Sequence, residues 1–346
     1  MSVRACIIGV AGETLRPEEA RFLNEMQPWG VILMGRNCIS RSQVKALVDQ
    51  IWQALERTCL IFIDQEGGRV ARLKAPEWPE FPSAGQYGAL YAKHPEAGLE
   101  AAWLGHRLIG HELASLSIHA NCAPALDRYV EGASNVIGDR AFSDTPDAII
   151  ALGRAALSGL NEAGVAGVIK HMPGHGRALI DSHEGLPHLT VSREDLADDI
   201  ACFSALSGAS MGMSAHIAYH AFDPDRPATL SPIVISDVIR GRIGFNGLLM
   251  TDDLGMKALA DDLGERAAKA IEAGCDIALH CAGFVKDPSE ILAEMRQIAE
   301  AVPILTGQSL DRARQAENLP QSSKDFDIEA GYARLEALMM LSGDYV

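Results

Sequence analysis

The stretch PDAIIALGRAALSGLNEAGVAGVIKH, residues 146–171, contains one complete unit of the repeat that decides the fold. Its first part, 146–164, has the apolar period and the residue types of an amphipathic helix, and Gly164 is a typical helix stop. The second part, VAGVIKH (165–171), is a short continuous apolar run, which is typical of a parallel strand buried on both faces. The stretch therefore predicts a helix that leads directly into a buried strand.

The same alternation extends in both directions along the chain. Seven further apolar runs are predicted to be strands: ACIIGVA (5–11), GVILM (30–34), LIFID (60–64), IHANCAPALD (118–127), ASMGMSAH (209–216), GLLMTD (247–252) and CDIALH (275–280). Helical patterns lie between them, among them 17–26, 42–55, 96–115 and 264–274, the last of which ends at Gly274. Eight strands alternating with helices favour a closed α/β barrel, the (β/α)8 or TIM barrel, over an open doubly wound sheet.

The alternation is not interrupted by a linker rich in Pro, Ser or Gly, and 48% of the 346 residues are hydrophobic, which is enough for one large core. We therefore predict a single barrel domain over residues 1–346, with the barrel core at 1–301 and a helical extension at 302–346. One amphipathic helix is expected in the extension, EAGYARLEALMMLSG at 329–343, packed on the outside of the barrel.

Charge and cysteine content limit the partners and the compartment. The formal net charge of −16 would repel nucleic acid and anionic membranes, so neither is expected as a partner. No run of 18 apolar residues predicts a transmembrane helix, and the N-terminal run lacks the cleavage site of a signal peptide. The seven cysteines are scattered and form no C-x-x-C pair, which indicates reduced thiols and a cytoplasmic location. Monomer and dimer both remain open.

Six consecutive predicted strands end in ionisable residues, although their interiors are almost wholly apolar. A barrel enzyme builds its active site from the C-terminal ends of its strands, which makes these positions candidates. They are Asp64, Asp127, Lys170 with His171, His216, Asp252 with Asp253, and His280. The pattern predicts an active site at this end of the barrel.

The longest polar loop, KHMPGHGRALIDSHEGLPHL at 170–189, follows the fifth strand and contains four histidines. Its glycines and its place on the catalytic face indicate a mobile element that carries a proton donor. His171 and His175 also have the four-residue spacing of metal ligands on a helix, but Pro173 and Gly174 interrupt a helix there. A metal site is therefore the less favoured interpretation.

These segments together resemble the bacterial exo-β-N-acetylglucosaminidases of glycoside hydrolase family 3 that act in cell-wall recycling. The matching stretches, within roughly residues 1–300, are IDQEGGRVARL (63–73), NCAPALD (121–127), IGDRAF (137–142), KHMPGHG…DSH…P (170–187) and MTDDLGM (250–256). The 170–187 pattern is the most specific, because it combines several fixed residues with a fixed gap. Met172 stands where the family commonly has Phe, a departure that concerns the packing of the loop.

The resemblance implies a retaining exo-glycosidase that removes terminal non-reducing β-linked N-acetylglucosamine through a covalent glycosyl-aspartate, with no cofactor and no metal. It implies peptidoglycan-derived muropeptides as substrates, and chitooligosaccharides remain open. By the resemblance, Asp252 corresponds to the nucleophile, His183 to the general acid/base and Asp181 to the orienting partner of His183. The groups that correspond to the binding site of the terminal sugar are Asp64, Arg72, Arg140, Lys170 and His171.

The chemistry of a retaining glycosidase suits these residue types, because it needs a carboxylate nucleophile and a proton donor. A histidine can serve as both acid and base near neutrality, and Asp181 can accept a hydrogen bond from the His183 ring. Successive strand side chains face opposite ways, so one of Asp252 and Asp253 can point into the site, and the sequence alone does not choose between them.

Several alternatives remain at this point. Glu66 and Glu184 are alternative proton donors, and Asp127 and His216 are weaker site candidates from their positions at strand ends. A metal-dependent barrel hydrolase would use the same histidines and aspartates as ligands. A β-glucosidase or xylosidase of similar fold is a further alternative. A non-catalytic sugar-binding barrel would be favoured if the nucleophile or the Asp–His pair were absent, but Asp252, Asp181 and His183 are all present.

Overall fold

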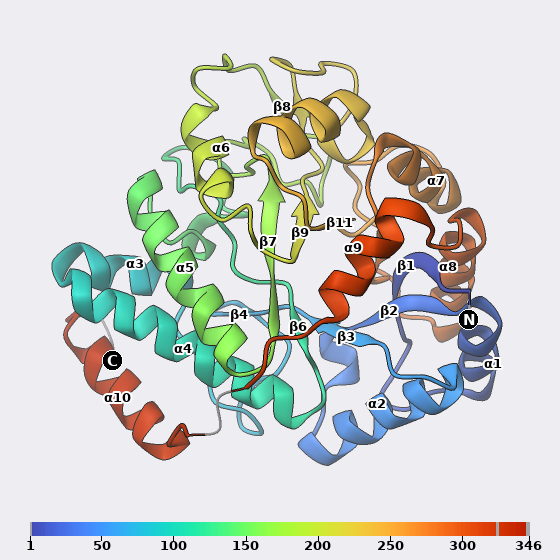
Figure 1. Ribbon diagram of the computed structural model, residues 1–346, viewed down its shortest axis with the longest axis horizontal. Coiled ribbons are helices and arrows are strands. Elements are labelled where there is room, and N and C mark those ends of the chain that lie inside the picture. The colour runs from blue at the N-terminus through green and yellow to red at the C-terminus, as the bar shows by residue number, and fades with distance from the viewer. Residues whose placement is uncertain (1, 323–324, 344–346) are drawn as a thin grey trace.

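The computed structural model describes residues 2–322 and 325–343, and its main strands form one parallel sheet (Figure 1). The strands are β1 (Arg4–Gly9), β2 (Pro28–Leu33), β3 (Leu60–Ile63), β6 (Ala120–Asn121), β7 (Ala166–Met172), β9 (Met211–Ser214), β11 (Leu248–Thr251) and β12 (Ala278–His280). Their order in the sheet is β11-β9-β7-β6-β3-β2-β1-β12. A parallel bridge between Met250 and Ile277 brings the two end strands together, so the sheet curls into a barrel. The predicted eight-stranded barrel is confirmed.

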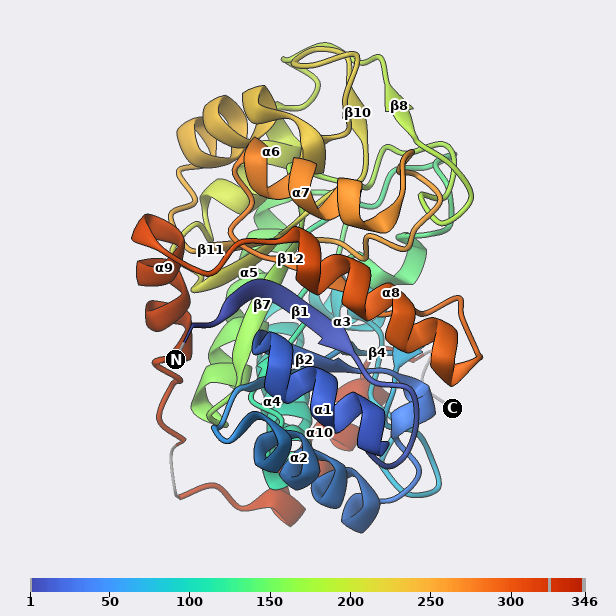
Figure 2. The same cartoon turned by 90° about the vertical axis from the view of Figure 1, so that its right-hand side faces the viewer.

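Helices surround the sheet and connect its strands (Figures 1 and 2). They are α1 (Pro17–Met26), α2 (Arg41–Leu55), α3 (Ala84–Lys93), α4 (Pro95–Ser115), α5 (Pro146–Glu162), α6 (Ala197–Ser204), the π-helical segment η4 (Val234–Arg242), α7 (Leu263–Ala273) and α8 (Pro288–Ala301). The five helices predicted between strands are confirmed to within two residues at each end. The prediction omitted α8, although it has an ordinary amphipathic pattern, and it omitted α3, α6 and η4, which lie within long connections.

Local sequence explains where two of these helices end. Gly164, after α5, has a φ of +83°, and Gly274, after α7, has a φ of +115°. This left-handed conformation strains residues that have a Cβ atom, so a glycine allows the chain to leave the helix there and enter the next strand. Both predicted helix stops are confirmed.

A helix that the sequence analysis did not predict lies at the N-terminal end of the barrel strands. In α9 (Gly307–Glu317), the Ser309 hydroxyl donates to the Asp276 carboxylate at 2.7 Å and Arg312 binds it at 3.0 Å. Asp276 is buried just before β12. The described part of the segment after residue 301 therefore contains two helices, where one was expected.

The expected exterior helix is α10 (Ile328–Met340), which lies beside α4 in both views (Figures 1 and 2). Tyr332 donates to Glu112 of α4 at 2.9 Å, and Arg334 pairs with Glu100 of the same helix at 2.6 Å. The predicted helix is confirmed. The division of the chain into a core and an extension at residue 301 stays a prediction.

Short accessory strands lie at the opposite, C-terminal end of the barrel. β4 (Gln65–Gly67) and β5 (Val70–Ala71) form a hairpin after β3, and β8 (His188–Leu189) pairs with β10 (Ala218–Tyr219) beyond β7 and β9. At Gly67, which has a φ of +96°, a Cβ atom would lie 2.3 Å from the carbonyl oxygen of Pro82, so the hairpin requires glycine there. These strands shape the rim above the barrel.

All seven cysteines are free thiols, and six of them are buried. Across the described ranges of the chain, none of the helices combines the length and the apolar character that crossing a membrane requires.

Candidate active site

A network of paired charges lies at the C-terminal ends of β3 and β7. One oxygen of Asp64, directly after β3, accepts from Lys170 Nζ at 3.1 Å, and the other accepts from Arg72 at 3.0 Å. Glu66 lies 2.6 Å from the same Lys170 nitrogen and accepts two hydrogen bonds from Arg140, at 2.8 and 2.9 Å. Two carboxylates and three cations thus share one network.

These pairings keep every member of the network ionised. Burial alone would raise the pKa of the Glu66 carboxyl, but Arg140 and Lys170 hold that pKa far below its usual range. Burial would likewise raise the pKa of Asp64, and Lys170 and Arg72 lower it. The pKa of Lys170 is raised by the two carboxylates against the effect of burial. Glu66 is therefore a fixed anion at neutral pH, which argues against its use as a proton donor.

Asp252 follows β11 and is the more accessible choice for a nucleophile. Its Oδ1 accepts the N–H of Asp253 at 2.8 Å, and its Oδ2 lies 4.0 Å from His171 Nε2. Burial alone would raise the pKa of Asp252, but His171 and His216 hold it below its usual range, so the group is an anion at neutral pH. Asp253, in contrast, directs Oδ1 to the His280 ring at 2.8 Å. The geometry therefore favours Asp252 over Asp253.

Asp127 holds His171 at ring nitrogen Nδ1, whereas the other nitrogen, Nε2, is the one nearer Asp252. The Asp127 carboxylate lies 2.6 Å from His171 Nδ1 and accepts the backbone N–H of His175 at 2.6 Å. The His175 ring in turn lies 3.1 Å from the hydroxyl of Ser182, in the middle of the D-S-H motif. His171 Nδ1 and His175 Nε2 thus contact protein groups, and Asp127 holds both residues at the start of the loop.

His183, the candidate proton donor, is hydrogen-bonded to Asp181, the aspartate that the sequence analysis paired with it. Asp181 Oδ1 lies 2.6 Å from His183 Nδ1 and also accepts the backbone N–H of His183 at 2.9 Å. Because the carboxylate occupies Nδ1, Nε2 is the ring atom left to exchange a proton. The His183 ring packs edge-on against Phe284, which follows β12, with 5.8 Å between ring centroids.

One cavity of about 350 Å³ brings all eight predicted site residues together. Its polar lining contains these eight residues, Asp64, Arg72, Arg140, Lys170, His171, Asp181, His183 and Asp252, together with Glu66, Arg69 and Asp253. Apolar groups that the sequence analysis missed complete the wall, namely Ile32, Met34, Met213, Met256, Leu279 and Phe284. Several of these lie at or just beyond strand ends, and that position is the signal that could have found them. The volume is in the usual range of small-ligand sites.

The weaker site candidates, Asp127 and His216, and the alternative proton donor Glu184 lie outside the cavity. Asp127 and His216 are buried and do not line the cavity. His216 Nε2 donates to the carbonyl oxygen of Asp253 at 3.1 Å, and its Nδ1 lies 2.8 Å from the Thr229 hydroxyl. Glu184 is exposed on the loop outside the cavity. In the described part of the chain, no three His, Cys, Asp or Glu side chains are grouped as metal ligands would be.

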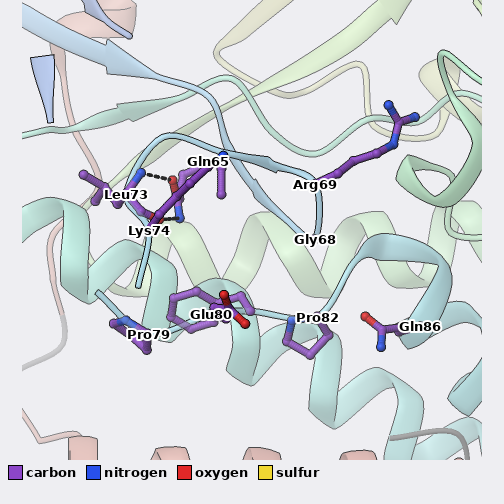
Figure 3. A pocket seen from close by; sticks show the side chains of 11 residues that line it. Gln65, Gly68, Arg69, Leu73, Lys74, Pro79, Glu80, Pro82 and Gln86 are labelled. Carbon is purple, nitrogen blue, oxygen red and sulfur yellow. Dashed lines mark hydrogen bonds between the residues drawn. The ribbon is translucent and has the colours of Figure 1, made fainter. Parts of the chain in front are cut away.

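A second hollow, of about 480 Å³, lies between the β4–β5 hairpin and the segment before α3 (Figure 3). Figure 3 shows Glu80 and Pro82 on one side of it and Gln65 on the other. Arg69 points away from these side chains, and it binds Asp139 at 2.7 Å. Because this hollow does not gather converging charged groups, we place the candidate active site in the 350 Å³ cavity.

A barrel that gathers a free carboxylate, a supported histidine and paired cations at its strand ends defines the class of (β/α)8-barrel enzymes. Comparison with known proteins gives the family. Residues 5–315 match the model of the glycosyl hydrolase family 3 N-terminal domain. The chain therefore belongs to glycoside hydrolase family 3, and it is a glycoside hydrolase.

Individual relatives are similar over most of the chain. A β-hexosaminidase of Alkalilimnicola ehrlichii is 38% identical over 306 residues, which is 86% of this chain and 85% of the relative. The structure of NagZ from Neisseria gonorrhoeae in complex with N-trifluoroacetyl-D-glucosamine is 30% identical, with a TM-score of 0.85 and 99% of both chains covered. A family 3 β-N-acetylglucosaminidase from Paenibacillus is 29% identical with a TM-score of 0.83, covering 96% of this chain and 66% of that one.

The charge network predicts that Glu66→Gln weakens sugar binding without removing proton transfer. Loss of a charged hydrogen-bond partner costs about 1.5–3 kcal/mol, so KM should rise roughly 10- to 150-fold. Steady-state kinetics with aryl glycosides of graded leaving-group ability measure this, and all leaving groups should be affected alike. Glu184→Gln, on the exposed loop, is the matched control and should change little. A loss confined to poor leaving groups would instead identify Glu66 as the proton donor.

Proposed function

We propose that this protein is a retaining exo-β-N-acetylglucosaminidase that hydrolyses terminal non-reducing β-linked N-acetylglucosamine. The observation that carries the proposal is the single cavity in which the Asp252 carboxylate and the Asp181–His183 pair face one set of paired charged groups. The similarity to a protein bound to an N-acylated glucosamine supports the choice of sugar.

In the first step, Asp252 attacks the anomeric carbon and the glycosidic bond breaks. The leaving oxygen takes the proton of His183 Nε2, and Asp181 stabilises the imidazolium beforehand through its 2.6 Å contact with Nδ1. In the second step, neutral His183 takes a proton from water as the water attacks the same carbon, and the Asp252 carboxylate is released. Atoms and charges balance over the two steps without a cofactor.

The remaining groups position the sugar. Asp64 and the three cations offer acceptors and donors to sugar hydroxyls, and their pairing fixes the side chains before the sugar arrives, which lowers the entropy cost of ordering them. His171, 4.0 Å from Asp252 Oδ2, lies close enough to influence the nucleophile directly. Asp127 fixes His171 in turn through its contact with Nδ1.

We assign the reaction to the breakdown of peptidoglycan-derived muropeptides in the cytoplasm. The free thiols support a reducing compartment. His183 is exposed by 45% at the rim of the cavity, so the leaving-group side is open enough for a large aglycone.

Substrate choice tests the assignment of the sugar. Aryl β-N-acetylglucosaminides should be turned over at least about 100-fold more efficiently than the matched glucosides or xylosides, because groups that recognise the acetamide are left unpaired by the others. Activity should survive exhaustive treatment with EDTA. Equal turnover of the three sugars would refute the assignment, and loss of activity on chelation would favour the metal-dependent alternative.

The covalent step is tested at Asp252. An activated 5-fluoro analogue of N-acetylglucosamine should trap a glycosyl ester on Asp252, which peptide mass spectrometry locates. Asp252→Asn should reduce kcat on the order of 10,000-fold or more, because it removes the nucleophile while leaving its strand intact. Asp253→Asn should still accept the label. A label on Asp253 or on a glutamate would overturn the assignment.

The role of His183 is tested by leaving-group dependence within one variant. For His183→Ala, glycosylation with poor leaving groups should slow on the order of 100- to 10,000-fold, because they need a proton. Glycosylation with dinitrophenolate should be nearly spared, whereas hydrolysis of the intermediate should stay slow and be accelerated by azide. Asp181→Asn should show a milder form of the same pattern. A uniform loss across leaving groups, without azide rescue, would assign the proton donor elsewhere.

A further inference from the structure

The eighth barrel strand ends in a histidine that the proposed chemistry does not use. His280 is 1% exposed and lies between two carboxylates. Its Nδ1 is 2.8 Å from Asp253 Oδ1, and its Nε2 is 3.0 Å from Glu294 Oε2 on α8. Carboxylate oxygens accept hydrogen bonds, so each ring nitrogen carries a hydrogen and the ring is an imidazolium.

The charges around His280 favour this state. Burial would lower the pKa of His280, but its hydrogen bonds to Asp253 and Glu294 raise the pKa to about 9. Burial would raise the pKa of Asp253, and its contact with His280 is the main reason that this pKa falls to about 2. The imidazolium is therefore present at neutral pH and is lost only as pH rises through about 9.

Other charged groups surround the three residues. Arg36, from the segment after β2, and Arg266, from α7, both act electrostatically on Asp253 and Glu294. The neighbouring Cys281 thiol is neutral, because burial and the Asp253 charge raise its pKa. Two carboxylates thus balance the imidazolium and part of the charge of the two arginines.

Asp253 connects this buried ion group to the candidate nucleophile. Its N–H donates to Asp252 Oδ1 at 2.8 Å, and its carbonyl oxygen accepts from His216 at 3.1 Å. Its carboxylate, besides the contact with His280, accepts the N–H of Gly255 at 3.0 Å and that of Cys281 at 3.1 Å. A displacement of the Asp253 carboxylate would therefore move the peptide group that holds the reactive carboxylate.

The space around the ring is also closely packed. A Cβ atom on Gly255 would lie 2.8 Å from Cε1 of His280, so the turn after Asp253 closes directly over the imidazole. His280 itself does not line the active-site cavity. Its influence on the reaction is therefore indirect.

We propose that His280 is a positioning residue: held between Asp253 and Glu294, it fixes the Asp253 N–H that orients the Asp252 carboxylate for attack. This inference rests on the proposed function, because it assigns Asp252 the role of nucleophile. Misplacing a reacting group by about 1 Å can cost on the order of 100-fold in rate. The effect is expected on kcat, since the sugar-binding groups belong to a separate network.

The test compares three substitutions with one control substitution. His280→Leu removes both hydrogen bonds, whereas His280→Asn keeps a donor near the position of Nδ1. Glu294→Gln weakens the ion group from the far side, and Glu290→Gln, an exposed residue one turn earlier on α8, is its matched control. His280→Leu should lower kcat on the order of 10- to 100-fold with KM within about twofold, and His280→Asn should recover part of the loss.

Two readouts separate positioning from a structural role. In nitrogen-15 NMR, the His280 ring should be doubly protonated at pH 8 and titrate near pH 9. In Glu294→Gln, the titration of the His280 ring should move to lower pH, because one of the groups that raise its pKa has lost its charge. Affinity for a competitive N-acetylglucosamine analogue and the thermal midpoint, measured alongside, should stay close to wild type in Glu294→Gln and His280→Asn.

The outcomes distinguish this inference from the proposed function. Wild-type kcat in folded His280→Leu, or a ring that titrates at or below pH 6.5, would overturn the positioning role. If His280→Leu does not fold, His280→Asn and Glu294→Gln decide, and an unchanged kcat in both would count against the positioning role. If wild-type protein neither hydrolyses N-acetylglucosaminides nor forms a glycosyl ester on Asp252, the proposed function fails. In that case His280 has no nucleophile to position, whatever the NMR titration gives.

Discussion

The Lys170 ammonium group, buried at the end of β7, is the interaction on which the rest of the site depends. An ammonium removed from water at 2% exposure needs anionic partners, and without them its desolvation costs several kcal/mol. Asp64 and Glu66 supply them from β3 and the hairpin that follows it, and Glu66 then anchors Arg140. Through these ion pairs, the buried Lys170 charge holds together the end of β3, the β4–β5 hairpin and the segment that carries Arg140.

The fold and the strand-end members of the candidate site could be predicted from local patterns, whereas Arg72, Arg140, Asp181 and His183 are assigned through the family resemblance. Runs such as 165–171 are apolar because both faces of a barrel strand are covered, and ionisable residues such as Lys170 and Asp252 can occur only where those strands end. Tertiary contacts decided the rest. The sequence does not show that Glu66 is neutralised by Lys170 and Arg140, or that Asp253 turns to His280, since both depend on side-chain direction.

The two candidate catalytic groups are held in different ways. Asp252 is fixed by a barrel strand and by the Asp253 peptide, whereas His183 lies on the long loop after β7. One attachment is at Ser182, whose hydroxyl meets His175 and whose carbonyl oxygen accepts the N–H of Ala258 at 3.1 Å. The loop therefore places the proton donor, and the barrel places the nucleophile.

The contact between α9 and Asp276 has a consequence for the order in which the chain folds during synthesis. The Asp276 carboxylate accepts the N–H of Leu249 at 2.9 Å and thereby joins the ends of β11 and β12, and it binds both Arg240 at 2.7 Å and Arg312 of α9 at 3.0 Å. β12 also pairs with β1, where Cys6 lies opposite Ala278. Pairing across such a sequence separation forms slowly, and it cannot begin before the eighth strand has been translated. The barrel therefore closes late, and its seam is complete only once the ribosome has released α9.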